Sequence, residues 1–373
     1  MPRVVALIGS NGSVNTTTAL TGVFNTNNPR SVATVDGSSF YVSGQGVTGD
    51  GTGGVFYATL GATTATPINA NTTTPSGNPN GTANPLLATE TRVVQIVNNG
   101  LGNTLYVSRD FAAKGSPNDS TDIRTLTNAS GGLPTSSSGL VANRIIPGNT
   151  NSSGGNTGSI DLTLNTDNGI NSTRDPQSSK YAGGNTFVYL SPEQYFFASP
   201  SVLYVTDSGQ PKNGNANAAA LGDGGLQKWV NSKPDGTGSW TLEYDLSAGL
   251  NLVNNANANA NTPTAPGVTG LFGLTGEDVN VNGTVEVELF ATSYGLNELS
   301  PSYLYEITDT LTDTTLAQAS GESFNTLYEA PAGTNIRGVA FAPVPEPSSI
   351  AILGAGLAAL SLLCRRRPSA RDA

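Results

Sequence analysis

The chain has 373 residues, and its 27 Asp and Glu against 17 Lys and Arg give a formal net charge of −10 at pH 7. It contains no His and a single cysteine, Cys364, which excludes Ser-His-Asp and Cys-His catalysis, His-ligated metals and internal disulfides. The acidic balance argues against a nucleic-acid partner. Apolar residues make up 36% of the chain and occur in short clusters between turn residues, which favours short strands over long helices.

The N-terminus predicts a strand, not an export signal. Only five apolar residues, Val4–Ile8, follow Met1-Pro2-Arg3 before the turn that begins at Gly9, and the hydrophobic region of a signal peptide is longer. Because the C-terminal features described below imply export, we expect the sequence to lack an N-terminal segment that carries the signal peptide.

Strand-like runs separated by turn residues continue from there to residue 343. The first two, Ser31–Val35 and Ser39–Ser43, flank Asp36-Gly37, which is a hairpin signal. The other predicted strands are Gly54–Leu60, Arg92–Val97, Asn103–Ser108, Asn185–Leu190, Val202–Asp207, Gly225–Val230, Ser239–Leu246, Val268–Leu274, Gly283–Ser293, Ser302–Thr308, Ser323–Glu329 and Ile336–Ala342. They fall into sets of about four strands over roughly 40 to 65 residues, which predicts an all-β, β-propeller-like repeat body. A pair of β-sandwich domains or a β-helix is the alternative.

The repeat is clearest at three equivalent tripeptides, Phe40-Tyr41-Val42, Leu105-Tyr106-Val107 and Leu203-Tyr204-Val205. Together with Gly225–Trp229 and Arg337–Pro343, these runs resemble a set of exported bacterial β-propeller-like proteins. The resemblance implies six or seven blades in the complete protein. It also implies that the strand near residue 337 closes the ring by joining a blade begun near the N-terminus.

Residues 344–373 carry three features in order at the end of the chain. Pro345-Glu346-Pro347 comes first, then the uncharged run Ile350–Cys364, then Arg365-Arg366-Arg367. With Ser348 and Ser349 the apolar run would span about 25 Å as a helix, close to a hydrocarbon core of ~30 Å. The arginines would stop transfer and hold the tail in the cytoplasm, so we predict a single C-terminal transmembrane helix. A permanent tail anchor or a buried helix of the body is the alternative.

This arrangement resembles the PEP-CTERM sorting signal of Gram-negative bacteria. The resemblance implies that exosortase, a membrane peptidase, recognises the Pro-Glu-Pro motif and cuts near it, and that the protein then reaches the cell surface or the extracellular matrix. Proline disfavours helix in the residue before it, so Glu346 would stand in an extended segment just outside the membrane. We therefore divide the chain into an exported body, residues 1–343, and a sorting signal, residues 344–373.

Candidate sites in the body are few, and no cofactor is predicted. Asp278, Asn280 and Asn282, followed by Gly283, match the first half of a calcium loop, but Leu289 stands where a bidentate Glu is needed. The alternating valines around these residues favour a hairpin over this weak calcium site.

Two pairs of carboxylates alternate along predicted strands, Glu243 with Asp245 and Glu286 with Glu288, and each pair would share one face. Paired carboxylates support glycosidase chemistry. Trp229 and Trp240 offer rings for sugar stacking or for packing.

The sequence therefore favours a non-enzymatic surface or matrix protein that binds exopolysaccharide or other surface proteins. An extracellular carbohydrate-active enzyme that uses Asp and Glu on a propeller scaffold is the alternative. The residues at the central channel would discriminate them: converging carboxylates favour the enzyme, while Ser, Thr and Asn favour binding.

Overall fold

The computed structural model describes residues 1–47, 50–70, 91–98, 100–111, 120–146, 160–161, 187–188, 192–208, 224–250, 252, 267–281, 283–295 and 301–341. Among these residues no helix is long and apolar enough to cross a membrane. The predicted membrane helix, Ile350–Cys364, lies outside them.

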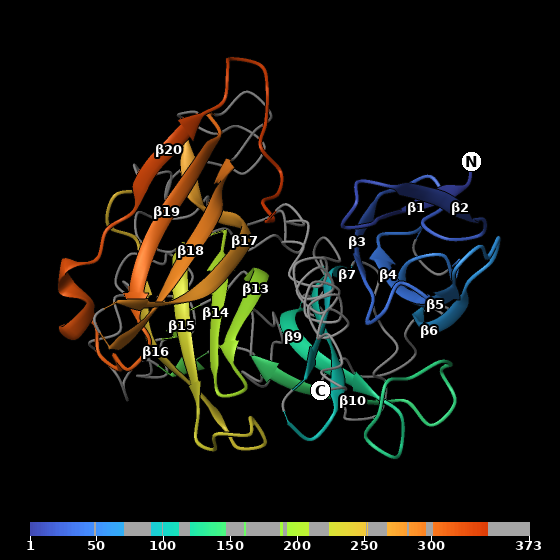
Figure 1. The fold of residues 1–373 in the computed structure, drawn as a ribbon, viewed down its shortest axis with the longest axis horizontal. Helices are drawn as coiled ribbons and strands as arrows, with labels where there is room; N and C mark the ends of the chain where they lie inside the picture. Colours follow the sequence, from blue (N-terminus) through green and yellow to red (C-terminus); the bar gives the residue numbers. More distant parts are fainter. Residues whose placement is uncertain are drawn as a thin grey trace, which may run out of the picture.

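The described residues form an all-β body with four four-stranded antiparallel sheets, each a simple meander in chain order (Figure 1). The first sheet contains β3 (Pro29–Ala33), β4 (Ser39–Gly44), β5 (Gly54–Thr59) and β6 (Thr66–Ala70), and the second contains β7 (Thr91–Asn98), β8 (Asn103–Phe111), β9 (Ser120–Thr127) and β10 (Val141–Ile146). The third contains β13 (Pro192–Ser199), β14 (Val202–Asp207), β15 (Gly225–Asn231) and β16 (Trp240–Leu246), and the fourth contains β17 (Val268–Val281), β18 (Thr284–Gly295), β19 (Tyr303–Thr310) and β20 (Asn325–Glu329).

The sheets are arranged like propeller blades, because their first strands lie next to one another. Strand β3 contacts β7, β7 contacts β13, and β13 contacts β17. Figure 1 shows the first sheet and the fourth sheet on opposite sides of the molecule. The four-stranded units and their meander order confirm the predicted propeller-like body.

One hydrogen bond recurs at each step between consecutive sheets. The Ser43 hydroxyl on β4 donates to the carbonyl of Arg92 on β7 at 2.9 Å, and the Ser108 hydroxyl on β8 donates to the carbonyl of Glu193 on β13 at 2.8 Å. The Thr206 hydroxyl on β14 donates to the carbonyl of a β17 residue, Phe272, at 2.9 Å. These hydroxyl residues directly follow the three Tyr-Val pairs that mark the repeat in the sequence.

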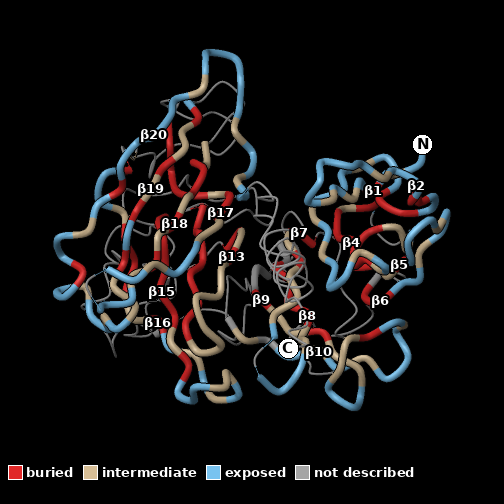
Figure 2. The backbone as a smooth tube through the Cα atoms, viewed as in Figure 1, coloured by how far each residue is buried: buried red, intermediate tan, exposed pale blue. Residues whose placement is uncertain are grey.

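The apolar core lies between consecutive sheets, as Figure 2 shows by the buried stretches along the inner strands. The first and second sheets meet at a cluster that includes Tyr41, Ile68 and Leu105, while Tyr106 and Trp229 belong to the cluster between the second and third sheets. The largest cluster joins the third sheet to the fourth. The second and third sheets are therefore covered on both faces in the manner of stacked blades.

Two further strand pairs do not complete a blade. Strands β1 (Arg3–Ile8) and β2 (Val14–Leu20) form a hairpin that packs on the first sheet through Val5 and Leu20, and β11 (Ile160–Asp161) pairs only with β12 (Phe187–Val188). The described residues thus hold four complete blades, and the six or seven blades of the prediction are not shown.

One strand prediction was wrong, and another predicted strand has a different partner from the expected one. The partner of β14 is β13, whose Pro192-Glu193-Gln194 start hides its apolar alternation, whereas the described part of the predicted strand Asn185–Leu190 is β12, which pairs with β11. The predicted closing strand at Ile336–Ala342 is not a strand in its described part: residues 336–341 have no ladder partner. The Ile336 N–H donates to the Ser302 hydroxyl at 2.9 Å, which holds the start of this segment next to β19.

Candidate functional site

A cavity of about 830 Å³ lies where the first strands of the sheets converge. Its walls come from all four sheets and from the segment after β20. The lining residues are Asn28, Pro29, Arg30, Ser31, Arg92, Val93, Gln194, Phe272, Arg337, Gly338, Val339 and Ala340. The cavity occupies the position of a propeller's central channel.

Three arginines from separate elements line this cavity. Arg30 and Arg92 are each the second residue of the first strand of a sheet, and Arg337 comes from the segment after β20. Arg30 and Arg337 are exposed, whereas Arg92 is buried and forms an ion pair with Glu193. The Arg92 guanidinium also lies 5.8 Å from the centre of the Phe272 ring.

The remaining polar groups at the cavity hold the strands in place. The Ser31 hydroxyl accepts from the Val94 N–H at 3.3 Å, and the side-chain oxygen of Gln194 accepts from the Leu274 N–H at 3.1 Å. These bonds link β3 to β7 and β13 to β17, so the walls are fixed by the inter-blade contacts themselves.

Among the described residues that line the cavity there is no Asp or Glu, and Glu193, which is next to the lining residue Gln194 in the sequence, forms an ion pair with Arg92. The lining is therefore cationic and polar. Guanidinium groups present several N–H donors in a plane and recognise carboxylates and phosphates by paired hydrogen bonds. The described lining is therefore of a kind that suits an anion.

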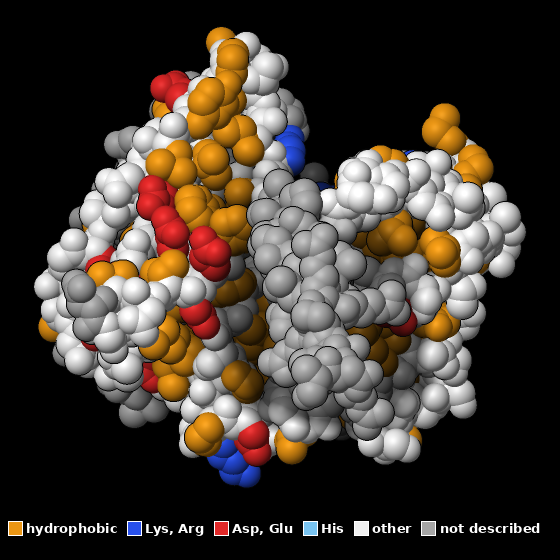
Figure 3. All heavy atoms as spheres, viewed as in Figure 1, with side chains coloured by type: hydrophobic (Ala, Val, Ile, Leu, Met, Phe, Trp, Pro, Cys, Tyr) orange, Lys and Arg blue, Asp and Glu red, His pale blue; other side chains and the backbone are white. Residues whose placement is uncertain are grey.

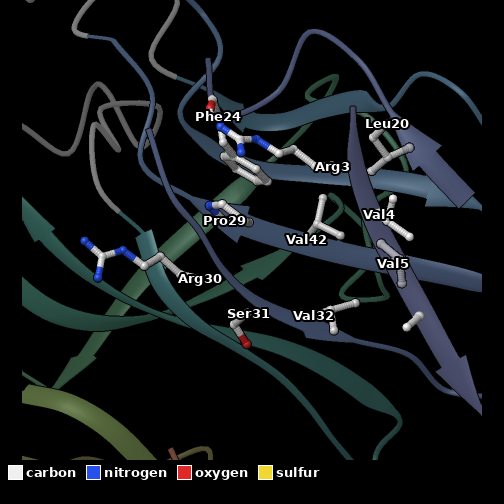
Figure 4. A pocket seen from close by; sticks show the side chains of 11 residues that line it. Arg3, Val4, Val5, Leu20, Phe24, Pro29, Arg30, Ser31, Val32 and Val42 are labelled. Atoms are coloured by element: carbon white, nitrogen blue, oxygen red, sulfur yellow. Dashed lines mark hydrogen bonds between the residues drawn. The ribbon is translucent and has the colours of Figure 1, made fainter. Parts of the chain in front are cut away.

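A second, smaller cavity of about 280 Å³ lies between the β1–β2 hairpin and the first sheet. Figure 4 shows Val5, Leu20 and Val42 around it, with Arg30 directed away from these apolar side chains. The Arg3 guanidinium donates to the carbonyl oxygens of Phe24 and Asn27, so this arginine fastens the hairpin to the loop before β3. This cavity is mostly apolar and belongs to the packing of the hairpin.

The carboxylates predicted from the strand pattern do not converge on the central cavity. Glu243 is half-buried on β16, where burial raises its pKa, and Asp245 on the same strand is buried. Glu286 and Glu288 share the partly exposed face of β18, as predicted. Acidic side chains gather with hydrophobic ones on the molecular face over β18 and β19 (Figure 3).

On that face Glu288 has an acidic neighbour that sequence reasoning missed. Glu306 on β19 pairs directly with Phe290, two residues along β18 from Glu288. Burial, then a hydrogen bond and charge repulsion from Glu306, raise the pKa of Glu288.

The two tryptophans, Trp229 and Trp240, pack in the apolar core between the second and third sheets. Trp229 is buried, and its indole N–H donates to the side-chain oxygen of Gln227 at 2.9 Å. Trp240 is partly buried and meets Phe197 edge-on, with ring centroids 6.0 Å apart. Both rings serve the junction between the second and third sheets.

The candidate calcium residues lie at the tip of the β17–β18 hairpin. Val281 pairs with Thr284, and Gly283 has φ +90°, so the predicted hairpin is confirmed. The Asn280 side chain accepts from the Gly283 N–H at 3.0 Å, and burial raises the pKa of Asp278. Asn282 lies outside the described residues.

The sorting residues Pro345, Glu346 and Pro347 and the cluster Arg365, Arg366 and Arg367 also lie outside the described residues. The central arginines, by contrast, were not predicted. A signal for two of them exists, because Arg30, Arg92 and Glu193 occupy the same second position in the first strand of three successive sheets. Aligning the sets by their Tyr-Val pairs places Arg30 and Glu193 at one position, eleven residues before the tyrosine, but it does not place Arg92 there.

Comparison with known proteins identifies the C-terminal segment directly. Residues 343–367 match the PEP-CTERM protein-sorting motif. This match confirms the predicted resemblance of the tail and implies an exported protein that exosortase processes. No curated protein matches the chain.

Solved structures similar to the body are glycoside hydrolases with very low sequence identity. An α-L-arabinofuranosidase from Lactobacillus brevis is 8% identical with a TM-score of 0.37, and the match covers 82% of this chain and 72% of that one. A GH43 endo-arabinanase from Bacillus licheniformis is 12% identical with a TM-score of 0.36, over 80% and 79% of the two chains. An α-L-arabinanase mutant from Cellvibrio cellulosa is 12% identical with a TM-score of 0.32, over 76% and 70%.

The prediction that the protein is not an enzyme is corrected by these matches, because all three similar structures are enzymes. The likeness concerns the fold alone and assigns no activity to this chain. The chain is an exported protein whose propeller-like all-β body precedes a PEP-CTERM sorting motif at residues 343–367.

Proposed function

We propose that the chain is a surface-sorted binding protein made of two parts, a body at residues 1–343 and a sorting signal at residues 344–373. In this proposal the apolar run Ile350–Cys364 spans the membrane until exosortase cuts near Pro345-Glu346-Pro347. The body is then delivered to the cell surface or the extracellular matrix. The match of residues 343–367 to the sorting motif supports this route.

The body binds an acidic exopolysaccharide through the central cavity. The observation that carries this proposal is the set of three arginines, Arg30, Arg92 and Arg337, in a cavity whose lining includes no Asp or Glu. A volume of about 830 Å³ accommodates sugar residues. Sugar carboxylates match the planar guanidinium, and Asn28, Ser31 and Gln194 supply amide and hydroxyl groups for sugar hydroxyls.

The binding experiment uses the full chain in detergent, with polygalacturonate as the acidic probe and dextran as the neutral one. The double variant Arg30→Gln, Arg337→Gln should weaken polygalacturonate binding at least about tenfold, because two charge-assisted contacts are lost. Arg92 is left unchanged because it is paired with Glu193 in the interior. Arg124→Gln on β9, which does not line the cavity, is the matched control.

Wild-type affinity in the Arg30, Arg337 double variant would contradict the assignment of the cavity. Equal binding of dextran and polygalacturonate would contradict the acidic ligand. Binding should also weaken with added salt, because the contacts are between opposite charges.

A second candidate, a carbohydrate-active enzyme, is favoured by one observation. Glu288 and Glu306 are neighbouring carboxylates on a partly exposed face, the pKa of Glu288 is raised, and paired carboxylates are what glycoside hydrolysis requires. Its test is the release of reducing ends from the same two polysaccharides. Release by the wild-type chain that disappears in Glu288→Gln and Glu306→Gln would favour this candidate, and its absence would reject it for these substrates.

A further inference from the structure

A buried lysine and aspartate face each other between the third and fourth sheets. Lys228 on β15 and Asp309 on β19 are both inaccessible to solvent, and Lys228 Nζ lies 2.6 Å from Asp309 Oδ2. Burying two charges has a large desolvation cost, which a single ion pair rarely repays. The central cavity and the sorting tail do not use this pair.

Lys228 lies between two tyrosines on the neighbouring strands of the third sheet. Lys228 pairs in register with Tyr204 on β14 and with Tyr244 on β16. Both tyrosine hydroxyls donate to the carboxylate of Asp309, one to each oxygen, and Lys228 Nζ donates to the Tyr244 hydroxyl at 2.9 Å. The Asp309 carboxylate is thus held by three donors that converge from the opposite sheet.

A second carboxyl group lies beside the first. Glu322 follows the 3-10 helix η3 (Gln318–Gly321), and its Oε1 accepts from the Thr310 N–H at 3.2 Å. Its other oxygen is buried without a hydrogen-bond partner among the described groups. Burial, then the neighbouring Asp309 carboxylate, raise the pKa of Glu322 to about 8. The raised pKa favours the protonated form of Glu322, so this residue can carry a proton beside Asp309.

Apolar side chains surround this group and exclude water. Leu226, Leu289, Ile307 and Phe324 are buried in the same cluster between the two sheets. An amine in contact with a carboxyl group, a neighbouring acid to move protons, and a dry site are the requirements for direct condensation of the two groups.

We propose that Lys228 and Asp309 form an intramolecular amide bond, with Glu322 as the proton relay, which covalently links the third and fourth sheets. Glu322 takes a proton from the Lys228 ammonium as it gives its own to Asp309. The lone pair of Nζ then attacks Asp309 Cγ, the C–N bond forms, one C–O bond breaks, and the oxygen leaves as water. One ammonium and one carboxylate give one amide and one water, so no oxidant or other reactant is needed.

The tyrosines assist this step by their position. The hydroxyls of Tyr204 and Tyr244 donate to the two Asp309 oxygens, where negative charge develops as the amine adds to the carbonyl. The amide bond would also give residues 1–343 a covalent cross-link, which a disulfide cannot supply because the only cysteine is Cys364. An amide between blades would restrain the chain outside the cell in the same way.

The test is the mass of the full chain, produced in a bacterium that lacks exosortase and purified in detergent. The wild-type chain should weigh one water less than its sequence, and a chymotryptic digest should yield a branched peptide that joins Lys228 to Asp309. Glu322→Gln should keep the full sequence mass while remaining folded by circular dichroism. Glu306→Gln, the same substitution at the partly exposed face of β19, should still lose the water.

The full sequence mass in folded wild-type chain would overturn the proposal. Loss of water in Glu322→Gln equal to that of the wild type would overturn the relay role of Glu322. If Glu322→Gln does not fold, the branched peptide of the wild-type chain decides the matter alone, since its presence establishes the bond and its absence excludes it.

Discussion

Strand β19 has one acidic residue on each of its two faces, and each of them lies beside a glutamate from another element. The surroundings of these two carboxylate pairs differ. Asp309 faces the third sheet, where it meets Glu322, Lys228 and two tyrosines. Glu306 faces outward, where its partner is Glu288 on β18. The pKa of one glutamate is raised in each pair, Glu288 outside and Glu322 inside. The inner pair also has a cation, Lys228, in contact with Asp309.

The comparison shows that neighbouring acids form a fixed, hydrogen-bonded cluster when they are buried together with a cation. On the outer face water screens the charges, so the pair shifts a pKa and does little else. On the inner face each group is held by several partners, and removing one leaves the others desolvated. Substitutions on the two faces of one strand should therefore have very different costs.

The largest effect is expected for Asp309→Ala, measured, like Tyr244→Phe below, in the Glu322→Gln chain, where no amide forms. There it leaves the Lys228 ammonium buried without its counter-charge, which should lower the free energy of unfolding by about 3–5 kcal/mol. Urea unfolding of the purified chain measures this loss. The double variant Lys228→Met, Asp309→Ala should regain part of it, because no buried charge remains. A single-variant loss below about 1 kcal/mol would contradict the role of the cluster.

A smaller effect is expected for Tyr244→Phe. This change removes one donor to Asp309 and one acceptor of Lys228 with little change of volume, and should lower the free energy of unfolding by about 1.5–3 kcal/mol. Tyr328→Phe, on the exposed strand β20, is the matched control and should change it by about 0.5 kcal/mol or less. Equal effects of the two substitutions would remove the distinction between buried and exposed tyrosines.

The smallest effect is expected for Glu306→Gln on the outer face. The pKa of Glu288 is raised in the folded chain above its usual 4.5, so the folded state binds more protons and stability falls as the pH rises through this range. The substitution should move the pKa of Glu288 part of the way back, because burial remains the larger cause. NMR titration of the side chain measures the shift. An unchanged pKa would show that Glu306 contributes nothing.

The repeat could be predicted from the sequence because its signal is local. The Tyr-Val pairs lie on the second strand of the first three sheets, and the hydroxyl residue after each pair bonds to the next sheet. The Asn280–Gly283 hairpin was predicted for the same reason, since a turn depends on adjacent residues.

The central cavity and the buried cluster could not be predicted in this way. Arg30 and Arg337 line one cavity only because the first strands of successive sheets lie next to one another, and Lys228 contacts Asp309 only because the third and fourth sheets stack. The spacing of these residues along the sequence predicts neither arrangement. The strand β13 was missed for a different reason, because Pro192 and Glu193 at its start resemble a loop.

The measurement that tests the central claim most directly is the mass of the C-terminal peptide of the mature protein in its native host, with and without exosortase. We predict that the mature chain ends near Pro345-Glu346-Pro347 and is found at the cell surface or in the medium, and that loss of exosortase leaves residues 350–367 attached in the membrane fraction. A chain that keeps Ile350–Arg367 in the presence of exosortase would contradict the account.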